Sequence, residues 1–512
     1  MGRIKIEVRS HGFIVTLHYL NDILVLKDFN AELQSWKMIY DYAAKKNKYV
    51  VDRFYGIEFN GGKSFGYQIN LLNDFIAHLK NNGISQGEVE TVYLPEYTPA
   101  KNTLSIKDTF SLRDEQPKIV DHILSDKGIL KNVAVIPLQT GGGKTCSSLY
   151  SVFKSGLRAS VVLSLRHRNS WLTDIAKFFE EKPSNTLIID TNDKLVSVIE
   201  LANNDKMPEV SLIIFSTVVL KTYFKEYETL GTSSYGCLPQ NLYKLFGVGI
   251  RITDEAHEDL HFHFKHDILT HSIKSVCLSA TLISKDELKN RLFETIYPTP
   301  ARITGLVWKK YIIGVELGYR LKTPNKIKCL GSRGYSHSDF EKSIMENKAT
   351  LIGYFSMVLY IIENKFIPKY TPGQKILVYF FTTEMANLFV NYVNSHITNK
   401  QFRPIAFIKN MEESELEGYD IVVSNMKKSG TGKNIPGLTT IINTIAVNSF
   451  ELNLQSPGRI REIKESFPGV DPVFYYLVCL SIRKHIDYHN DRLRLYRDKF
   501  AKIITHTTNF II

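Results

Sequence analysis

Short apolar runs alternate with longer amphipathic stretches from about residue 112 onward. Five runs lie in the first half of the chain and four in the second: 133–137, 160–164, 212–216, 249–253, 275–278, 376–380, 405–408, 420–424 and 440–444. Buried strands that alternate with helical segments predict parallel βαβ units. The fold class we expect is therefore α/β, with two doubly wound parallel sheets in tandem.

The two ends of the chain follow other patterns. Residues 1–105 mix alternating stretches with a helical stretch around 71–79, which predicts a small α+β domain. Within it, the turn 60–62 (Asn-Gly-Gly) between two β-rich runs predicts a hairpin. Apolar residues recur every three or four positions from Ile482 to Ile503, which predicts one amphipathic helix, packed on the second sheet or open to a partner. The expected domains are 1–105, 106–300, 301–480 and a C-terminal helix over 481–512.

Length, charge and cysteine content narrow the class of protein. A chain of 512 residues is too long for one hydrophobic core. Its net charge of +12 favours a polyanionic partner, although a solvated basic surface is the alternative. Five scattered cysteines argue against a disulfide framework and a zinc ribbon. We see no signal peptide, and the apolar stretch 351–362 is too short to cross a bilayer, so we expect a cytoplasmic protein without a membrane partner.

Residues 139–145 read Gln-Thr-Gly-Gly-Gly-Lys-Thr between a predicted strand and a predicted helix. Glycines let the backbone curl until its N–H groups point at phosphate oxygens. Lys144 would neutralise the β- and γ-phosphates of ATP, and the Thr145 hydroxyl would bind Mg²⁺. The candidate nucleotide-binding residues of this loop are Thr140, Gly141, Gly142, Gly143, Lys144 and Thr145.

Asp254 and Glu255 follow the β-rich run 249–253. An aspartate at the carboxyl end of a strand can hold Mg²⁺, and a neighbouring glutamate can orient and deprotonate the attacking water. An alternative exists, because residues 257–261 match the H-E-x-x-H pattern of zinc proteases, which needs both histidines one turn apart in a helix. Lys144 with the two acids explains the region without zinc, and we favour that interpretation.

Four motifs occur in one order along the chain: 139–145, 254–257, 279–281 and 455–459. In this order they resemble the motifs of superfamily 2 helicases and translocases, with Asp254-Glu255-Ala256-His257 as a DEAH box. The resemblance covers roughly residues 110 to 480 and implies two RecA-like domains that hydrolyse ATP with Mg²⁺. It also implies that His257, Ser279 and Thr281 couple the nucleotide site to the nucleic-acid groove.

The resemblance further assigns an arginine to the transition state of hydrolysis. The family pattern Q-x-x-G-R-x-x-R matches Gln455 and Arg459, but a glutamate stands at its final position and Arg461 comes one residue earlier. Either Arg459 or Arg461 could be the arginine finger, so the choice stays open. Arg113 and Gln116 match the R-x-x-Q element that reads adenine in relatives, with a capped helix start as the alternative.

Loops after several predicted strands carry hydroxyls and cations, the groups that grip phosphates without reading bases. The stretch 427–434 resembles a family motif that includes Gly432 near the nucleotide, and Trp171 resembles a tryptophan of DNA translocases. The candidate DNA-binding residues are Arg166, His167, Trp171, Thr217, Thr382, Lys427 and Lys428. An ordinary surface loop is the alternative for each.

The stretches 54–61 and 492–500 favour a narrower resemblance, to UvsW-type phage recombination helicases, which remodel forked and branched DNA. It implies a monomeric ATP-dependent DNA helicase that reverses forks and migrates Holliday junctions in recombination or repair. Three alternatives remain: an RNA helicase, a duplex translocase that separates no strands, and a nucleic-acid-binding module with an inactive ATPase. Gln455, where RNA helicases usually have histidine, and Trp171 argue against the first.

Overall fold

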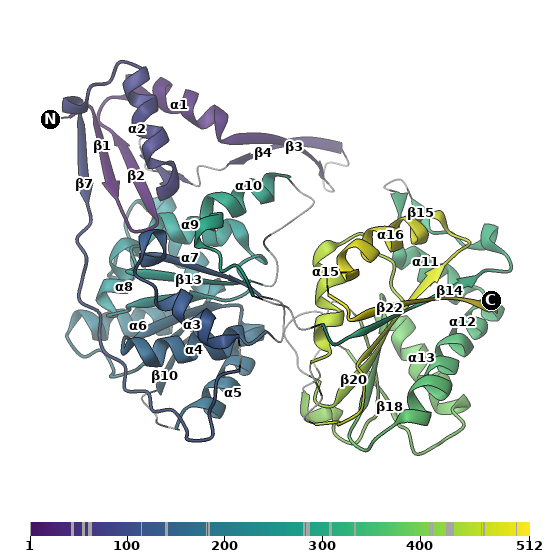
Figure 1. Cartoon of the computed structure of the whole chain (residues 1–512). Coiled ribbons are helices and arrows are strands. Elements are labelled where there is room, and N and C mark those ends of the chain that lie inside the picture. The colour runs from purple at the N-terminus through teal and green to yellow at the C-terminus, as the bar shows by residue number, and fades with distance from the viewer. Residues whose placement is uncertain are drawn as a thin grey trace. The chain divides into compact units, whose positions relative to one another are not determined.

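The structure is a computed structural model of the whole chain (Figure 1). It describes every residue except 1, 42–45, 54–56, 60–63, 114, 139–141, 181, 183–184, 280–281, 283–286, 307–309, 332–333, 409–410, 412, 426–434, 462, 464–465 and 498. The chain divides into two compact units, and the boundary lies between Leu306 and Val307. The first unit contains the N-terminal domain and the first large sheet, and the second contains the other large sheet.

The N-terminal domain has a five-stranded sheet, in the order β5-β6-β2-β1-β7, and two helices. These elements are β1 (Ile4–Val8), β2 (Gly12–Leu17), α1 (Ile23–Glu32), β5 (Ile57–Phe59), β6 (Ser64–Gln68), α2 (Leu72–Asn81) and β7 (Val89–Tyr93). The predicted hairpin is confirmed, because β5 and β6 pair antiparallel. A separate two-stranded ribbon, β3 (Gln34–Asp41) and β4 (Lys46–Arg53), follows α1 and extends away from this sheet (Figure 1).

Buried polar contacts fasten the N-terminal domain to helix α9 (Leu260–Leu269) of the same unit. The Arg9 guanidinium is buried and donates to the carbonyl oxygens of Ile268 and Leu269, at 3.2 and 2.6 Å. Gln68 Nε2 donates to Asp267 Oδ2 at 3.0 Å. Buried groups of this kind are costly to leave unsatisfied, so the N-terminal domain and the first large sheet form one body.

The first large sheet has six parallel strands in the order β10-β11-β9-β12-β13-β8. Its strands are β8 (Val133–Pro137), β9 (Ala159–Leu163), β10 (Thr186–Ile189), β11 (Leu212–Ser216), β12 (Ile250–Thr253) and β13 (Lys274–Ser279). Its helices are α3 (Gln116–Leu124), α4 (Lys144–Ser155), α5 (Arg168–Phe178), α6 (Asn192–Asn203), α7 (Thr217–Leu230), α8 (Leu242–Leu245), α9 and α10 (Glu287–Ile296). Five of these strands are the apolar runs of the sequence, because strands buried on both faces are apolar throughout.

The second large sheet has seven parallel strands in the order β18-β19-β17-β20-β21-β14-β22. They are β14 (Ile313–Arg320), β17 (Lys375–Phe380), β18 (Pro404–Phe407), β19 (Ile421–Asn425), β20 (Leu438–Asn443), β21 (Val473–Cys479) and β22 (Lys502–Ile511). The other elements are β15 (Leu330–Gly331), β16 (Gly334–Tyr335), α11 (His337–Glu346), α12 (Lys348–Ile361), α13 (Thr383–His396), α15 (Phe450–Gln455) and α16 (Arg483–Arg497). Two parallel sheets flanked by helices confirm the predicted α/β fold class.

The predicted C-terminal helix over 481–512 is wrong in its second half. Helix α16 ends at Arg497, and Lys502–Ile511 forms β22, which pairs in parallel with β14. The run Ile503-Ile504-Thr505 is β-branched, and such residues favour a strand that completes a half-buried sheet. The C-terminal segment is therefore part of the second sheet.

The apolar stretch predicted as too short for a membrane lies in a longer helical run, Lys348–Lys369. By length and composition alone this run could cross a membrane, but half of its most apolar window is buried inside the protein. Tyr354 and Val358 are fully buried in the core of the second unit. We interpret the run as a core helix.

Candidate nucleotide and nucleic-acid site

The described end of the phosphate loop is closely packed against helix α3. Gly143 has a φ of +82°, and a Cβ atom at this position would collide with the Gln116 amide. The positive φ favours glycine at this position, and a larger residue would also force the Gln116 side chain to move. The Gln116 oxygen accepts a hydrogen bond from the Arg113 backbone N–H at 2.8 Å. The predicted R-x-x-Q element thus touches the loop, while Arg113 itself is exposed.

Lys144 and Glu255 meet at the carboxyl edge of the first sheet. Lys144 begins α4, and its Nζ lies 3.2 Å from Glu255 Oε1, with both side chains largely buried. Glu255 has a φ of +45°, which residues other than glycine seldom adopt. The Asp254 carboxylate accepts from the Glu255 N–H at 3.0 Å and so supports this turn. The backbone conformation places two acids beside the lysine that begins the helix.

The two carboxyl groups have opposite pKa shifts. Burial raises the pKa of Asp254, and the negative charge of Glu255 adds to the rise. Burial also works to raise the pKa of Glu255, but the charges of Lys144 and His257 outweigh it and the pKa is lowered. Glu255 is therefore ionised at neutral pH and can accept a proton.

Trp171 is not exposed to nucleic acid in this unit, so its prediction as a DNA contact is wrong. Its side chain is buried, and the indole Nε1 donates to Asp254 Oδ2 at 2.8 Å. A buried ring cannot stack on a base. Its contact instead fixes the orientation of the acid, a role that the sequence does not reveal because α5 and β12 are far apart in the chain.

His257 connects the nucleotide site to the end of β13. Its Nδ1 lies 3.0 Å from the Ser279 hydroxyl and 3.3 Å from Glu255 Oε2. A shift of Glu255 would therefore be felt at Ser279 through one side chain. Thr281, the third predicted coupling residue, lies outside the described residues.

The zinc-protease alternative lacks the geometry that it requires. Helix α9 begins at Leu260, so His257 is not one turn before His261 in the same helix. The next histidine, His263, is buried, and burial lowers its pKa to about 3. Among the described residues, no group of three or more histidine, cysteine or acidic side chains could hold a metal ion.

The oxygen atoms beside Lys144 suit a hard divalent cation. Magnesium is bound in nucleotide sites by one or two protein oxygens together with phosphates and water. Thr145 lies in the first turn of α4, and Asp254 directly follows β12 at the same edge of the sheet. These two residues would hold Mg²⁺, as the sequence predicts.

Arg459 and Arg461 line one cavity of the second unit. Its volume is about 670 Å³, and Lys375 and Ile435 also line it. Arg459 is buried, whereas Arg461 is exposed, and Gln455 ends α15 just before them. Both arginines thus reach the same space, and the choice of the arginine finger stays a prediction.

Side chains of the loop after β9 form a cluster of ion pairs with Glu258. Arg166 pairs with Glu258, and His167 Nε2 lies 3.6 Å from the same carboxylate. Burial opposes ionisation of Glu258, but its hydrogen bonds with His167 and Arg166 outweigh burial and lower the pKa to about 2. Arg166 is still 46 % exposed, so a phosphate could compete for it, whereas His167 is buried. Thr217, the first residue of α7, is also buried.

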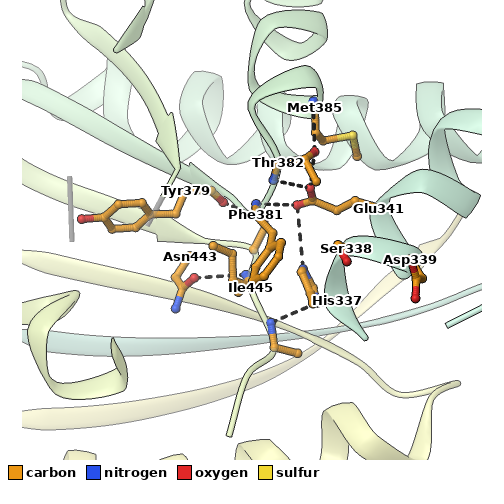
Figure 2. A network of polar contacts seen from close by, with 12 residues as sticks. His337, Ser338, Asp339, Glu341, Tyr379, Phe381, Thr382, Met385, Asn443 and Ile445 are labelled. Atoms are coloured by element: carbon orange, nitrogen blue, oxygen red, sulfur yellow. Dashed lines mark hydrogen bonds and ion pairs between the residues drawn. The ribbon is translucent and has the colours of Figure 1, made fainter. Parts of the chain in front are cut away.

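Thr382 is partly exposed and is held by a buried carboxylate, and its role as a direct DNA contact stays a prediction. The Thr382 hydroxyl and N–H each donate to Glu341 Oε2 at 2.7 Å, and the Phe381 N–H donates to Glu341 Oε1 at 2.7 Å (Figure 2). The hydroxyl also accepts from the Met385 N–H and caps α13. Glu341 thus occupies the anion position at the N-terminus of α13.

Burial is the largest influence on the pKa of Glu341. It raises the pKa to about 7, although three hydrogen bonds from Phe381 and Thr382 oppose the rise. His337 Nε2 lies 3.8 Å from Glu341 Oε1, and the His337 Nδ1 accepts from the Ala446 N–H (Figure 2). The sequence gives no sign of this cluster, because 40 residues separate Glu341 from the strand end that it holds.

Several predicted residues lie outside the described part of the chain: Thr140, Gly141, Thr281, Lys427, Lys428 and Gly432. Their roles stay predictions.

Comparison with known proteins gives a likeness of fold only. The chain matches no protein-family model and no curated protein. A variant of S. cerevisiae Dbp5 bound to a Gle1 variant and IP6 is 12 % identical, with a TM-score of 0.46, over 80 % of this chain and 96 % of that chain. S. cerevisiae Dbp5 bound to RNA and ADP BeF3 is 13 % identical, with a TM-score of 0.48, over 77 % of this chain and 89 % of that chain. Because so few residues are shared, function has to be argued from this chain's own residues.

Proposed function

We propose that this protein is an ATP-dependent nucleic-acid motor of the helicase type. The observation that carries the proposal is the meeting of Lys144, Glu255 and Asp254 beside a glycine turn at the N-terminus of α4. A helix N-terminus and a buried lysine favour phosphate, and the net charge of +12 favours a nucleic-acid partner.

In this proposal each residue has a separate task. Lys144 neutralises phosphate charge, and Glu255 accepts the proton of the attacking water. Thr145 and Asp254 hold Mg²⁺, which supplies further neutralisation of phosphate charge. Trp171 keeps the Asp254 carboxylate in place, and His257 carries a shift of Glu255 to Ser279.

The kind of nucleic acid is proposed on separate grounds. The resemblance to UvsW-type helicases favours forked or branched DNA and a role in recombination or repair. Trp171 had argued for DNA, and its burial removes that argument. One of the two Dbp5 structures is bound to RNA. With Trp171 buried, an RNA helicase is the second candidate function.

One substrate panel decides between these candidates. ATP hydrolysis and strand separation should be compared on forked DNA, Holliday junctions, linear duplex DNA and structured RNA. Stimulation of ATP hydrolysis by RNA alone would rule out the DNA motor, and stimulation by DNA alone would rule out the RNA helicase. Hydrolysis on duplex DNA without strand separation on any substrate would identify a translocase. If no nucleic acid stimulates hydrolysis, the proposed motor function is wrong.

A further inference from the structure

The β3–β4 ribbon pairs with no other strand in the part of the chain that the structure describes. Its two strands are eight residues each and are antiparallel in unbroken register. An isolated two-stranded ribbon is at best marginally stable in water. The ribbon therefore gains no stability from pairing with another described strand, and it belongs to a domain that is bonded to α9.

The ribbon presents two different faces at its described exposed positions. Met38 lies opposite Tyr49 in the register, so both project from one face, and they are 56 % and 65 % exposed. Lys46 and Lys48 alternate with Tyr49 along β4, so they project from the other face, and both are exposed. The register thus places Met38 and Tyr49 on one face and Lys46 and Lys48 on the other, where Asp41 stands opposite Lys46.

The segment 34–53 as a whole is rich in basic and aromatic residues. The segment contains five basic and two acidic residues, and four of its 20 residues are aromatic, against 12 % in the whole chain. Lysines alone could be explained as protection of an exposed strand edge against aggregation. Edge protection does not explain Met38 and Tyr49, because exposed apolar side chains on such a ribbon increase the hazard.

We propose that the β3–β4 ribbon contacts nucleic acid at a junction between single and double strands, with Tyr49 and Met38 against exposed bases and Lys46 and Lys48 against phosphates. Aromatic side chains stack on any base, and lysines bind the backbone without reading sequence. Only a junction offers unstacked bases and duplex phosphates close together. This inference rests on the proposed motor function and adds a substrate-contacting element outside the two large sheets.

The chain offers a matched control for the test. Tyr49→Ala removes a ring that is 65 % exposed, and Tyr93→Ala removes one that is 67 % exposed on β7 of the same domain. Neither residue is in the nucleotide site, so the basal ATPase of both variants should equal that of the parent. Tyr49→Phe keeps the ring and should behave as the parent.

The readout is the KM for forked DNA, and for a duplex RNA with a single-stranded tail, in the ATPase and strand-separation assays. We expect Tyr49→Ala to raise this KM roughly five- to a hundredfold, the effect of losing one base stack. Tyr93→Ala should leave it unchanged. Lys46→Ala with Lys48→Ala should also reduce the dependence of binding on salt, by a slope of about one to two.

The outcomes separate this inference from the proposed function. The ribbon inference is wrong if nucleic acid stimulates the parent but Tyr49→Ala and Tyr93→Ala have the same KM on both junctions. A ribbon that binds a protein instead of nucleic acid would give that result. If Tyr49→Phe fails as badly as Tyr49→Ala, stacking is not the cause and the inference is also wrong. If no nucleic acid stimulates the parent, the motor proposal itself has failed.

Discussion

At the scale of single residues, Trp171 shows how a side chain can be identified correctly as part of a site and still be given the wrong role. The sequence places it just after a predicted strand, where the helicases that the motifs resemble contact nucleic acid. Its indole N–H instead holds the Asp254 carboxylate at 2.8 Å. The distinction can be tested, because a magnesium site and a nucleic-acid contact affect different kinetic constants.

We expect Trp171→Phe to lower kcat of ATP hydrolysis about tenfold and to raise the Mg²⁺ requirement, with an unchanged KM for nucleic acid. A hydrogen bond to a charged group contributes about 1.5–3 kcal/mol, and part of it would be lost at the metal site. Steady-state kinetics over a series of Mg²⁺ concentrations measures this. Tyr243→Phe, which removes a buried hydrogen bond to His266, is the control. A raised KM for nucleic acid with normal kcat would restore the original prediction.

Ser279→Ala tests the coupling that is assigned to His257. Its hydroxyl is 3.0 Å from His257 Nδ1 but belongs to no predicted phosphate or metal contact. ATP hydrolysis should therefore persist within about threefold of the parent, which is a change of at most about 0.7 kcal/mol in the hydrolysis barrier, while strand separation falls at least tenfold. Parallel measurement of both activities decides. An equal loss of the two would place Ser279 in hydrolysis itself.

At the scale of elements, strands were predictable where they lie in the middle of a parallel sheet. Ile376–Phe380 and Leu212–Ser216 are apolar on both faces and short, so their sequence allows few alternatives. The C-terminal segment was not predictable in the same way. The spacing from Ile482 to Phe500 continues smoothly into Ile503, and only pairing with β14, nearly 190 residues earlier, makes the last ten residues a strand.

Removal of β22 should therefore destabilise the second unit. Deletion of residues 502–512 would expose one edge of β14 and lower the free energy of unfolding by about 1–3 kcal/mol. We therefore expect the melting temperature of the second unit to fall by several degrees. Differential scanning calorimetry and binding of an ATP analogue report on the two units separately. An unchanged melting profile would contradict the contribution of β22 to the second sheet.

Glu341 makes the stability of the second unit depend on pH. Its folded pKa is about 7, against 4.5 for an exposed glutamate, so the folded protein holds a proton that the unfolded chain releases between these values. The contribution of Glu341 to stability is full below pH 4.5 and is lost as the pH rises through 7. Two and a half pKa units correspond to roughly 3 kcal/mol.

Glu341→Gln should remove this dependence, because the amide does not titrate. Between pH 5 and pH 8 the parent should lose roughly 3 kcal/mol of unfolding free energy relative to the variant. Urea unfolding of both proteins over this pH range measures the loss. His337, Tyr335 and Tyr354 are the titratable groups near Glu341, and they are common to both proteins. Glu316→Gln is the control, since the pKa of Glu316 is lowered and its contribution is lost as the pH falls. A pH-independent difference would show that Glu341 stays ionised.

At the scale of the whole molecule, ordered motifs predicted a motor, and the first unit places their described residues together. Lys144 and Glu255 are 111 positions apart in sequence, yet they form an ion pair, because both follow parallel strands of one sheet. The nucleic acid could not be predicted with the same certainty. Groups that grip phosphates are common on any surface, and the geometry leaves fewer direct contacts than the sequence suggested.

The most direct test of the motor is a comparison of Lys144→Ala with the parent protein in nucleic-acid-stimulated ATP hydrolysis. We expect the parent to be stimulated by the preferred nucleic acid. The variant should hydrolyse ATP at least a hundredfold more slowly, a loss of about 2.7 kcal/mol or more of transition-state stabilisation, while it binds the same nucleic acid with nearly unchanged affinity. Hydrolysis by Lys144→Ala at the parent rate would contradict the assignment of the nucleotide site, and with it the proposal of an ATP-driven motor.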